Sequence, residues 1–242
     1  REQAVLAAVR AAAPQIGRMI ELATAALERG GRVVYAGAGT AGRVAAMDAT
    51  EIPPTFGTDP GAFTALVAGG PAALVDAREG DEDDAGAGAA AVAEAGVRDV
   101  DLVIGVSASG ATPYVLAAIA AARERGCTTV AVVNNVGTPL AAAADLAVEV
   151  LTGPELVAGS TRLMAGTAQK TVLNLVSTLA MVRTGHTFGN LMVGAAPVNA
   201  KLARRAVRSV ALAAEVDDTT AQAALDAADG APDTAVVMLR AA

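Results

Sequence analysis

Short apolar runs alternate with longer segments of helical periodicity along most of this chain, and the runs end at turns rich in glycine or hydroxyl residues. Several runs have the length of a buried parallel strand. They cover residues 33–36, 63–67, 102–106, 128–133 and 146–150. This alternation predicts an α/β fold, with a doubly wound, mostly parallel sheet, helices on both faces and a ligand at the carboxyl ends of the strands.

Helices are expected between these strands and after them. Pro14 either begins a second helix or kinks a longer one within residues 2–29, and Pro53-Pro54 should end the helix that begins near Ala41. The remaining helical segments of the main domain are 71–75, 84–95, 113–125 and 161–183, with a loop at 185–190. Three shorter helices follow at 199–216, 219–228 and 232–239. We therefore expect a larger α/β domain over 1–198, which would hold the ligand site, and a small helical domain over 199–242.

The third apolar run leads into a turn with three hydroxyl side chains, Ser107, Ser109 and Thr112, together with Gly110. Pro113 suits the first turn of the helix that follows. Because backbone N–H groups and the positive end of the helix dipole meet at a helix start, the pattern predicts a phosphate-binding cradle. The alternative is an ordinary helix capped by Ser or Thr.

The first apolar run leads into Gly37-Ala38-Gly39-Thr40-Ala41-Gly42, which matches the glycine pattern of a dinucleotide site. Such a site also needs an acidic residue after the next strand, but that strand runs into Ala68-Gly69-Gly70, and Asp59 lies in a turn before it. We therefore expect Gly39 and Thr40 to admit a sugar instead of a nucleotide. Ser160 and Thr161, beside Arg162 at another helix start, form a further candidate for substrate binding.

The composition of the chain excludes several kinds of binding partner. The chain has 242 residues, a formal charge of −7, one cysteine (Cys127) and one histidine (His186). An acidic chain is unsuited to nucleic acid, and no apolar run is long enough for a membrane span. Neither a Cys nor a His cluster is available for a metal, and the single cysteine fits a reducing cytoplasm. Because the sequence begins at Arg1, we expect the native chain to start earlier.

Segments in order along the chain resemble the N-acetylmuramic acid 6-phosphate etherases of bacterial cell-wall recycling, and the S-x-S-G-x-T turn resembles the phosphosugar loop of sugar isomerase (SIS) domains. The matching segments are VVYAGAGTAGRVAAMDATEIPPTFG, REGDEDD, VIGVSASGATPYV, GSTRLMAGTAQKTVLN, GNLMV and NAKLARRA. The resemblance implies a SIS-type fold with a small C-terminal helical domain, a homodimer, a small-molecule sugar phosphate as substrate, and no cofactor or metal.

Two carboxylates carry the chemistry that this resemblance implies. An open-chain sugar aldehyde acidifies the neighbouring C–H, one carboxylate removes that proton, and a protonated partner assists the departure of lactate before water adds back. By motif, Glu51 corresponds to the family's proton donor and Glu82 to its second catalytic acid. We interpret Glu82 as the base and Glu51 as the acid on motif position. The alternative for the acidic run 79–84 is a solvated cluster that caps a helix.

Three positions depart from the family pattern. Ala41, Ala111 and Met164 stand where the family usually has Ser, Arg and Lys, which predicts weaker phosphate binding or a changed substrate. Two other functions stay open at this point. A non-catalytic sugar-phosphate sensor similar to the glucokinase regulatory protein would need only the cradle, and a phosphosugar isomerase would need no acid for a leaving group.

Overall fold

The computed structural model describes residues 2–195 and 199–241. The chain divides into two compact units, the first containing residues 1–50 and 61–180 and the second 51–60 and 181–242. The domain boundary predicted at 198/199 falls on residues 196–198, which lie outside the described residues, so the division into domains 1–198 and 199–242 stays a prediction.

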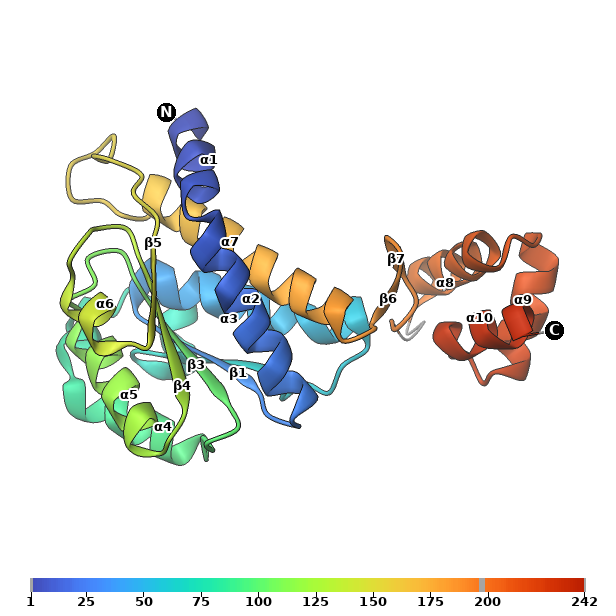
Figure 1. Cartoon of the computed structure of the whole chain (residues 1–242), viewed down its shortest axis with the longest axis horizontal. Helices are drawn as coiled ribbons and strands as arrows, with labels where there is room; N and C mark the ends of the chain where they lie inside the picture. The colour runs from blue at the N-terminus through green and yellow to red at the C-terminus, as the bar shows by residue number, and fades with distance from the viewer. Residues whose placement is uncertain (1, 196–198, 242) are drawn as a thin grey trace. The chain divides into compact units, whose positions relative to one another are not determined.

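Five parallel strands form the sheet of the first unit in the order β2-β1-β3-β4-β5 (Figure 1). They are β1 (Val33–Gly37), β2 (Phe63–Val67), β3 (Leu102–Ser107), β4 (Thr128–Val133) and β5 (Leu146–Glu149). The predicted strands are confirmed to within one residue at each end. Val33 pairs with Phe63 on one side and Leu102 on the other, so the chain leaves β1 in one direction and returns to its opposite side. This switch between β1 and β3 is where doubly wound sheets bind ligands.

Helices cover both faces of the sheet, which confirms the predicted α/β class (Figure 1). Val34 and Ala36 pack with Val115 and Ile119 on the face covered by α4 (Ala85–Glu94), α5 (Pro113–Glu124) and α6 (Pro139–Ala143). Tyr35 points to the opposite face. That face carries α2 (Ala13–Glu28), which follows α1 (Glu2–Ala11), and the first-unit parts of α3 (Gly39–Phe56) and α7 (Met164–Arg183).

A buried polar cluster joins β1, α3 and α7 on that second face. The Tyr35 hydroxyl donates to Asp48 Oδ2 at 2.8 Å, while Asn174 Nδ2 and Ser177 Oγ donate to Asp48 Oδ1 at 2.6 and 2.9 Å. Burial, and then the neighbouring Asp48, raise the pKa of Tyr35 well above its usual value, so its hydroxyl keeps the proton it donates. The cluster fixes α3 and α7 against the same strand.

The prediction that Pro53-Pro54 end α3 is wrong, because the helix continues through both prolines to Phe56. Each proline removes only its own N–H, so the carbonyls of Pro53 and Glu51 can still act as acceptors. The Pro53 carbonyl accepts the N–H of Gly57 at 2.9 Å, and the Glu51 carbonyl accepts the Thr55 hydroxyl at 2.6 Å. The helix therefore ends at Phe56, and Gly57 follows it with a φ of +69°, which suits glycine.

Smaller differences have local causes. α7 begins at Met164 instead of residue 161, because the preceding residues form turns. Residues 70–74 form a 3₁₀ helix, η1 (Gly70–Leu74), and the acidic run contains a second, η2 (Glu79–Asp83). Asp84 accepts the N–H of Ala87 and so caps α4, as the alternative interpretation of this run expected. The predicted loop at 185–190 contains strand β6 (Thr187–Phe188), which pairs with β7 (Leu191–Met192).

The second unit contains the three predicted C-terminal helices, α8 (Ala200–Ala214), α9 (Asp218–Ala227) and α10 (Pro232–Ala241). Asn199 accepts the N–H of Leu202 and Asp217 accepts that of Thr220, so each side chain begins a helix. Val210, Leu225 and Val236 lie in their shared core. No helix within 2–195 and 199–241 is long and apolar enough to cross a membrane.

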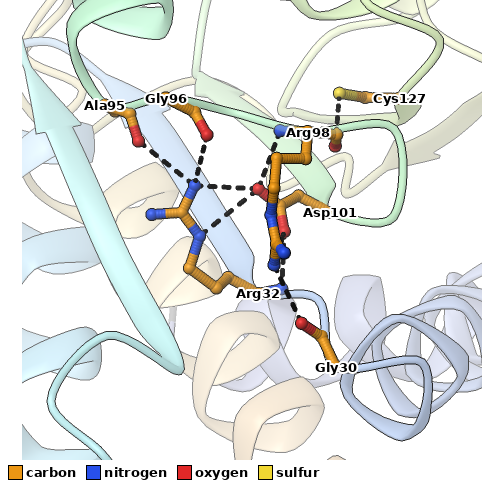
Figure 2. A network of polar contacts seen from close by, with 7 residues as sticks. All are labelled: Gly30, Arg32, Ala95, Gly96, Arg98, Asp101 and Cys127. Carbon is orange, nitrogen blue, oxygen red and sulfur yellow. Dashed lines mark hydrogen bonds and ion pairs between the residues drawn. The ribbon is translucent and has the colours of Figure 1, made fainter.

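An ionic network ties the amino ends of β1 and β3 together (Figure 2). The fully buried Asp101 carboxylate accepts the backbone N–H groups of Arg32 and Arg98 at 2.9 and 3.0 Å. It also pairs with the Arg32 guanidinium at 2.9 Å and the Arg98 guanidinium at 3.5 Å. Burial raises the pKa of Asp101, but the Arg32 side chain and these N–H groups outweigh burial, so the pKa lies below its ordinary value.

Candidate functional site

A cavity of about 550 Å³ lies at the carboxyl ends of β1, β2 and β3 in the first unit. This is the switch point of the sheet, and the volume suits a small organic ligand. Predicted site residues that line it are Gly39, Thr40, Glu82, Ser107, Ser109, Thr112, Ser160 and Thr161. Segments that are far apart in the sequence are thus brought together around one space, as their positions after parallel strands predicted.

The hydroxyl cradle is already assembled around Ser107. Its Oγ lies 2.9 Å from the Thr112 hydroxyl and 3.3 Å from the Ser109 hydroxyl, and it accepts the Gly110 N–H at 3.1 Å. The Ser109 hydroxyl accepts the Ala111 N–H at 3.2 Å. The sequence-based expectation of free N–H groups at this turn is therefore wrong for Gly110 and Ala111. The hydroxyls are bonded to these N–H groups, and it is the hydroxyls that line the cavity.

Gly110 supports the cradle from behind. It is buried, has a φ of +65°, and is not among the residues that line the cavity. A Cβ at this position would overlap the Thr138 side chain, and the Gly110 carbonyl accepts the Leu140 N–H at 2.9 Å. The absence of a side chain lets the cradle turn pack against the start of α6.

The glycine-rich turn after β1 has a packing explanation. A Cβ on Gly37 would lie 2.8 Å from the Gly42 backbone nitrogen, so these two glycines let α3 start close to the strand. Gly39 between them has a φ of +54°. β2 is followed by Ala68 and Gly69, as the sequence analysis expected, so no acidic side chain stands where a dinucleotide site needs one.

Three arginines line the cavity, Arg43, Arg78 and Arg162, against the single carboxylate of Glu82. The cavity wall is thus positively charged in a chain whose formal charge is −7. Of the three, sequence reasoning had singled out only Arg162. Arg78 lies beside Gly69, two residues after β2, since a Cβ on Gly69 would be 3.0 Å from Arg78 Cδ. Asp81 Oδ2 lies 3.9 Å from the Arg78 guanidinium. No local sequence pattern indicated that this segment would lie close to the end of β2.

Gln169 of α7 also lines the cavity, and sequence reasoning missed it. Its side chain is buried, and its Nε2 donates to Asn134 Oδ1 at 2.9 Å. Asn134 in turn donates to the Val150 carbonyl at 2.9 Å, which ties α7 to the ends of β4 and β5. The available signal was a glutamine near the start of a mostly apolar helix, close in sequence to the Ser160–Arg162 cluster that was already a binding candidate.

Glu51 belongs to the second unit and is described within it. It is exposed on α3, and its carbonyl accepts the Thr55 hydroxyl. The prediction that it shares a pocket with Glu82 stays a prediction. Among the described residues, no three His, Cys, Asp or Glu side chains are grouped so that they could hold a metal ion.

Comparison with known proteins gives matches over nearly the whole chain. The chain is 50% identical over 235 residues to a Streptomyces avermitilis protein named N-acetylmuramic acid 6-phosphate etherase, covering 97% of this chain and 76% of the relative. It is also 50% identical over 233 residues to the Deinococcus radiodurans protein of the same name, covering 96% of this chain and 76% of that relative.

Two family models match parts of the chain. The glucokinase regulatory protein N-terminal SIS domain matches residues 15–123, and the SIS domain matches residues 87–179. Among solved structures, a phosphoheptose isomerase from Francisella tularensis has a TM-score of 0.58 at 20% identity, covering 74% of this chain and 91% of that one. The phosphoheptose isomerase of Neisseria gonorrhoeae has a TM-score of 0.55 at 22% identity, covering 74% and 89%. These structures share the SIS fold of the first unit.

Proposed function

Because the chain belongs to the N-acetylmuramic acid 6-phosphate etherase family, we propose that the cavity at the ends of β1, β2 and β3 binds N-acetylmuramic acid 6-phosphate. The chain is a carbon–oxygen lyase that cleaves the lactyl ether by elimination and hydration. The products are N-acetylglucosamine 6-phosphate and D-lactate. The observation that carries the proposed site is the positively charged, hydroxyl-rich cavity wall in an acidic protein.

Ser107, Ser109 and Thr112 bind the phosphate in this proposal. A hydroxyl can donate to phosphate oxygen while its own oxygen accepts a backbone N–H, so the bonds to Gly110 and Ala111 orient the donors without using them up. The sugar extends from there toward Gly39 and Thr40, where the glycine leaves room for close approach. Ser160 and Thr161, which also line the cavity, supply further hydroxyls.

Glu82 is the proposed base. It lines the cavity from η2, and its carboxylate is exposed to the space where the open-chain sugar would lie. It removes the proton from the carbon that bears the acetamido group, because the neighbouring aldehyde stabilises the resulting negative charge. That electron pair then forms a carbon–carbon double bond as the ether C–O bond breaks.

Glu51 is the proposed acid and gives its proton to the departing lactate oxygen. Water then adds to the carbon that carried the ether, and a proton returns to the carbon bearing the acetamido group, which completes the hydration. Glu51 lies on α3, whose first residues, Gly39 and Thr40, line the cavity.

The three departures from the family pattern occupy different settings. Ala41 lines the cavity, Ala111 is exposed in the cradle turn, and Met164 is buried at the start of α7. Ala41 in the glycine-rich turn and Ala111 in the cradle turn each lack a side-chain donor, and we expect weaker phosphate binding than in relatives with Ser and Arg there. Met164 is buried where the family usually has Lys, so this chain lacks a cation at that position.

We propose a cytoplasmic homodimer. Individual exposed apolar side chains of the first unit are the candidates for the association surface. They are Leu6, Leu151, Leu156, Val157, Leu175 and Leu179.

Release of D-lactate tests the function. Purified protein is incubated with N-acetylmuramic acid 6-phosphate, and D-lactate and N-acetylglucosamine 6-phosphate are measured together. Equal amounts of both products are expected, whereas tight binding of the sugar phosphate without lactate release would favour a sensor. The match to the glucokinase regulatory protein domain makes that second outcome worth measuring, although the near-full-length relatives favour the etherase.

A further inference from the structure

The three arginines that line the cavity differ in what they already contact. Arg43 Nη2 donates to the Asp76 carbonyl at 2.9 Å, and Arg78 Nη1 lies 3.9 Å from Asp81 Oδ2. Arg162 makes no hydrogen bond or ion pair with any other residue in the ranges 2–195 and 199–241. Two of the cavity's cations are thus engaged within the chain, and the third has its full set of donors available to a ligand.

The segment that carries Arg162 is nevertheless held in place. The Glu155 carboxylate accepts the N–H groups of Met164 and Ala165, each at 2.9 Å, and the Thr161 carbonyl accepts the Gly166 N–H at 3.0 Å. These bonds fix the backbone on both sides of Arg162 against the start of α7. A positioned cation loses less freedom on binding than one on a loose loop.

Glu155 also limits which groups of the segment around Arg162 can bind an anion. Its carboxylate already occupies the N-terminus of α7, where the helix dipole and orphan N–H groups favour negative charge. That helix end is therefore not available to the substrate. The side chains of Ser160, Thr161 and Arg162 are what this segment presents to the cavity.

The proposed substrate carries two anionic groups, the phosphate and the carboxylate of the lactyl ether. The cradle after β3 is a cluster of mutually bonded hydroxyls that suits one of them, and Arg162 enters the cavity from a different segment. A carboxylate that leaves water needs a charged partner, and the planar guanidinium matches its two oxygens. We propose that Arg162 binds the lactyl carboxylate and so distinguishes substrate from product; this inference rests on the proposed function.

This assignment has a consequence for turnover. N-acetylglucosamine 6-phosphate keeps the phosphate but lacks the lactyl group, so the product retains the cradle contacts and loses the contact to Arg162. Arg162 thus determines specificity for the etherified sugar, and it weakens product competition at the site.

The experiment compares two ligands on matched variants. Kd values for N-acetylmuramic acid 6-phosphate and N-acetylglucosamine 6-phosphate are measured by calorimetry for wild type, Arg162→Gln, Arg162→Lys and the control Arg10→Gln, with KM and kcat for lactate release. The Glu51→Gln variant serves as background for the substrate Kd wherever turnover interferes. Arg10 is exposed on α1 and lies away from the cavity lining.

Arg162→Gln should raise Kd and KM for the muramic acid phosphate by roughly 10- to 100-fold, as loss of a charge-assisted pair does, and leave the product Kd within about 2-fold. Arg162→Lys should recover part of the loss, because it restores charge without the planar fork. Equal weakening of both ligands would show that Arg162 binds phosphate, and no weakening would show that it binds neither; either result overturns the proposal. Failure of wild type to release lactate would instead contradict the proposed function.

Discussion

The Ser107 and Thr112 hydroxyl oxygens lie 2.9 Å apart across the turn that ends β3, although neither caps the helix that follows. Ser107 is buried at the end of the strand, and Thr112 is only partly buried. This bond restricts both side chains, so little of their rotational freedom has to be lost when an anion binds.

The first prediction concerns the hydroxyl that is most accessible in this cradle. Ser109→Ala should weaken binding of N-acetylglucosamine 6-phosphate by about 1.5–3 kcal/mol, because it removes one donor to a charged oxygen. Calorimetric Kd values measure the effect. Thr178→Ala, an exposed hydroxyl of α7 that does not line the cavity, is the matched control. Equal affinities of the Ser109 variant and the control would remove Ser109 from the phosphate site.

The second prediction separates backbone strain from packing behind the cradle. Gly110 and Gly137 have similar φ values of +65° and +61°, but a Cβ would meet Thr138 only at Gly110, and at Gly137 it would meet open space. Gly137→Ala should cost about 1 kcal/mol of unfolding free energy for its left-handed backbone. Gly110→Ala should cost about 1–3 kcal/mol more and weaken phosphate binding, because the turn must move.

Thermal and urea unfolding, with Kd measured on the folded variants, test this pair. A Gly110→Ala variant that matched Gly137→Ala in both stability and affinity would show that the cradle does not depend on its packing against α6.

The third prediction concerns Asp101 and pH. Its pKa is lowered from an ordinary value of 3.8, so its contribution to stability is present above that value and is lost as pH falls through the lower pKa of the folded state. At pH 7, Asp101→Asn should reduce the unfolding free energy by about 3 kcal/mol, because Arg32 and Arg98 lose their buried partner. Asp99→Asn, an exposed neighbour, is the control.

Urea unfolding of wild type and the Asp101 variant at several pH values measures this contribution. The difference between the two proteins should be constant from pH 7 down to about pH 5 and shrink as the solution becomes more acidic than the ordinary carboxyl pKa. A difference that grew on acidification would contradict the direction of the shift.

Much of the fold could be read from the sequence because its signals are local. Apolar runs such as 102–106 are short and bounded by turn residues, and Pro14 and Gly30 mark helix ends that the structure confirms. The prediction that Pro53-Pro54 end α3 was wrong because other bonds outweigh the tendency of proline to break a helix. The bonds from Gly57 and Thr55 to carbonyls within the same turn keep that helix intact, and a proline rule considers only the lost N–H.

The site residues at the ends of strands could be predicted from the sequence. Some residues that other segments bring to the cavity were not predicted. Ser107 is the last residue of β3 and Thr40 lies three residues after β1, so parallel topology alone places them at one edge. Arg78 lies just before η2, and no local pattern indicated that it would reach the cavity. Gln169 lies near the start of α7, where a glutamine in a mostly apolar helix was the signal that sequence reasoning passed over. The cap formed by Glu155 could not be predicted, because Glu155 lies nine residues before Met164 in the sequence.

The last prediction separates the roles of Glu82 and Glu51. Proton removal precedes loss of lactate, so exchange of solvent deuterium into the carbon bearing the acetamido group reports the base alone. Glu82→Gln should stop this exchange and slow lactate release by roughly 10²- to 10⁴-fold, the usual contribution of a general base. Glu51→Gln should slow lactate release by a similar factor while exchange continues, because only the leaving-group acid is lost.

Glu124→Gln, a glutamate at the end of α5 outside the cavity lining, is the control for both. Phosphate affinity should change little in either variant, since neither carboxylate belongs to the cradle. Exchange that stops in the Glu51 variant and continues in the Glu82 variant would reverse the two assignments, and full turnover by both variants would exclude the elimination mechanism.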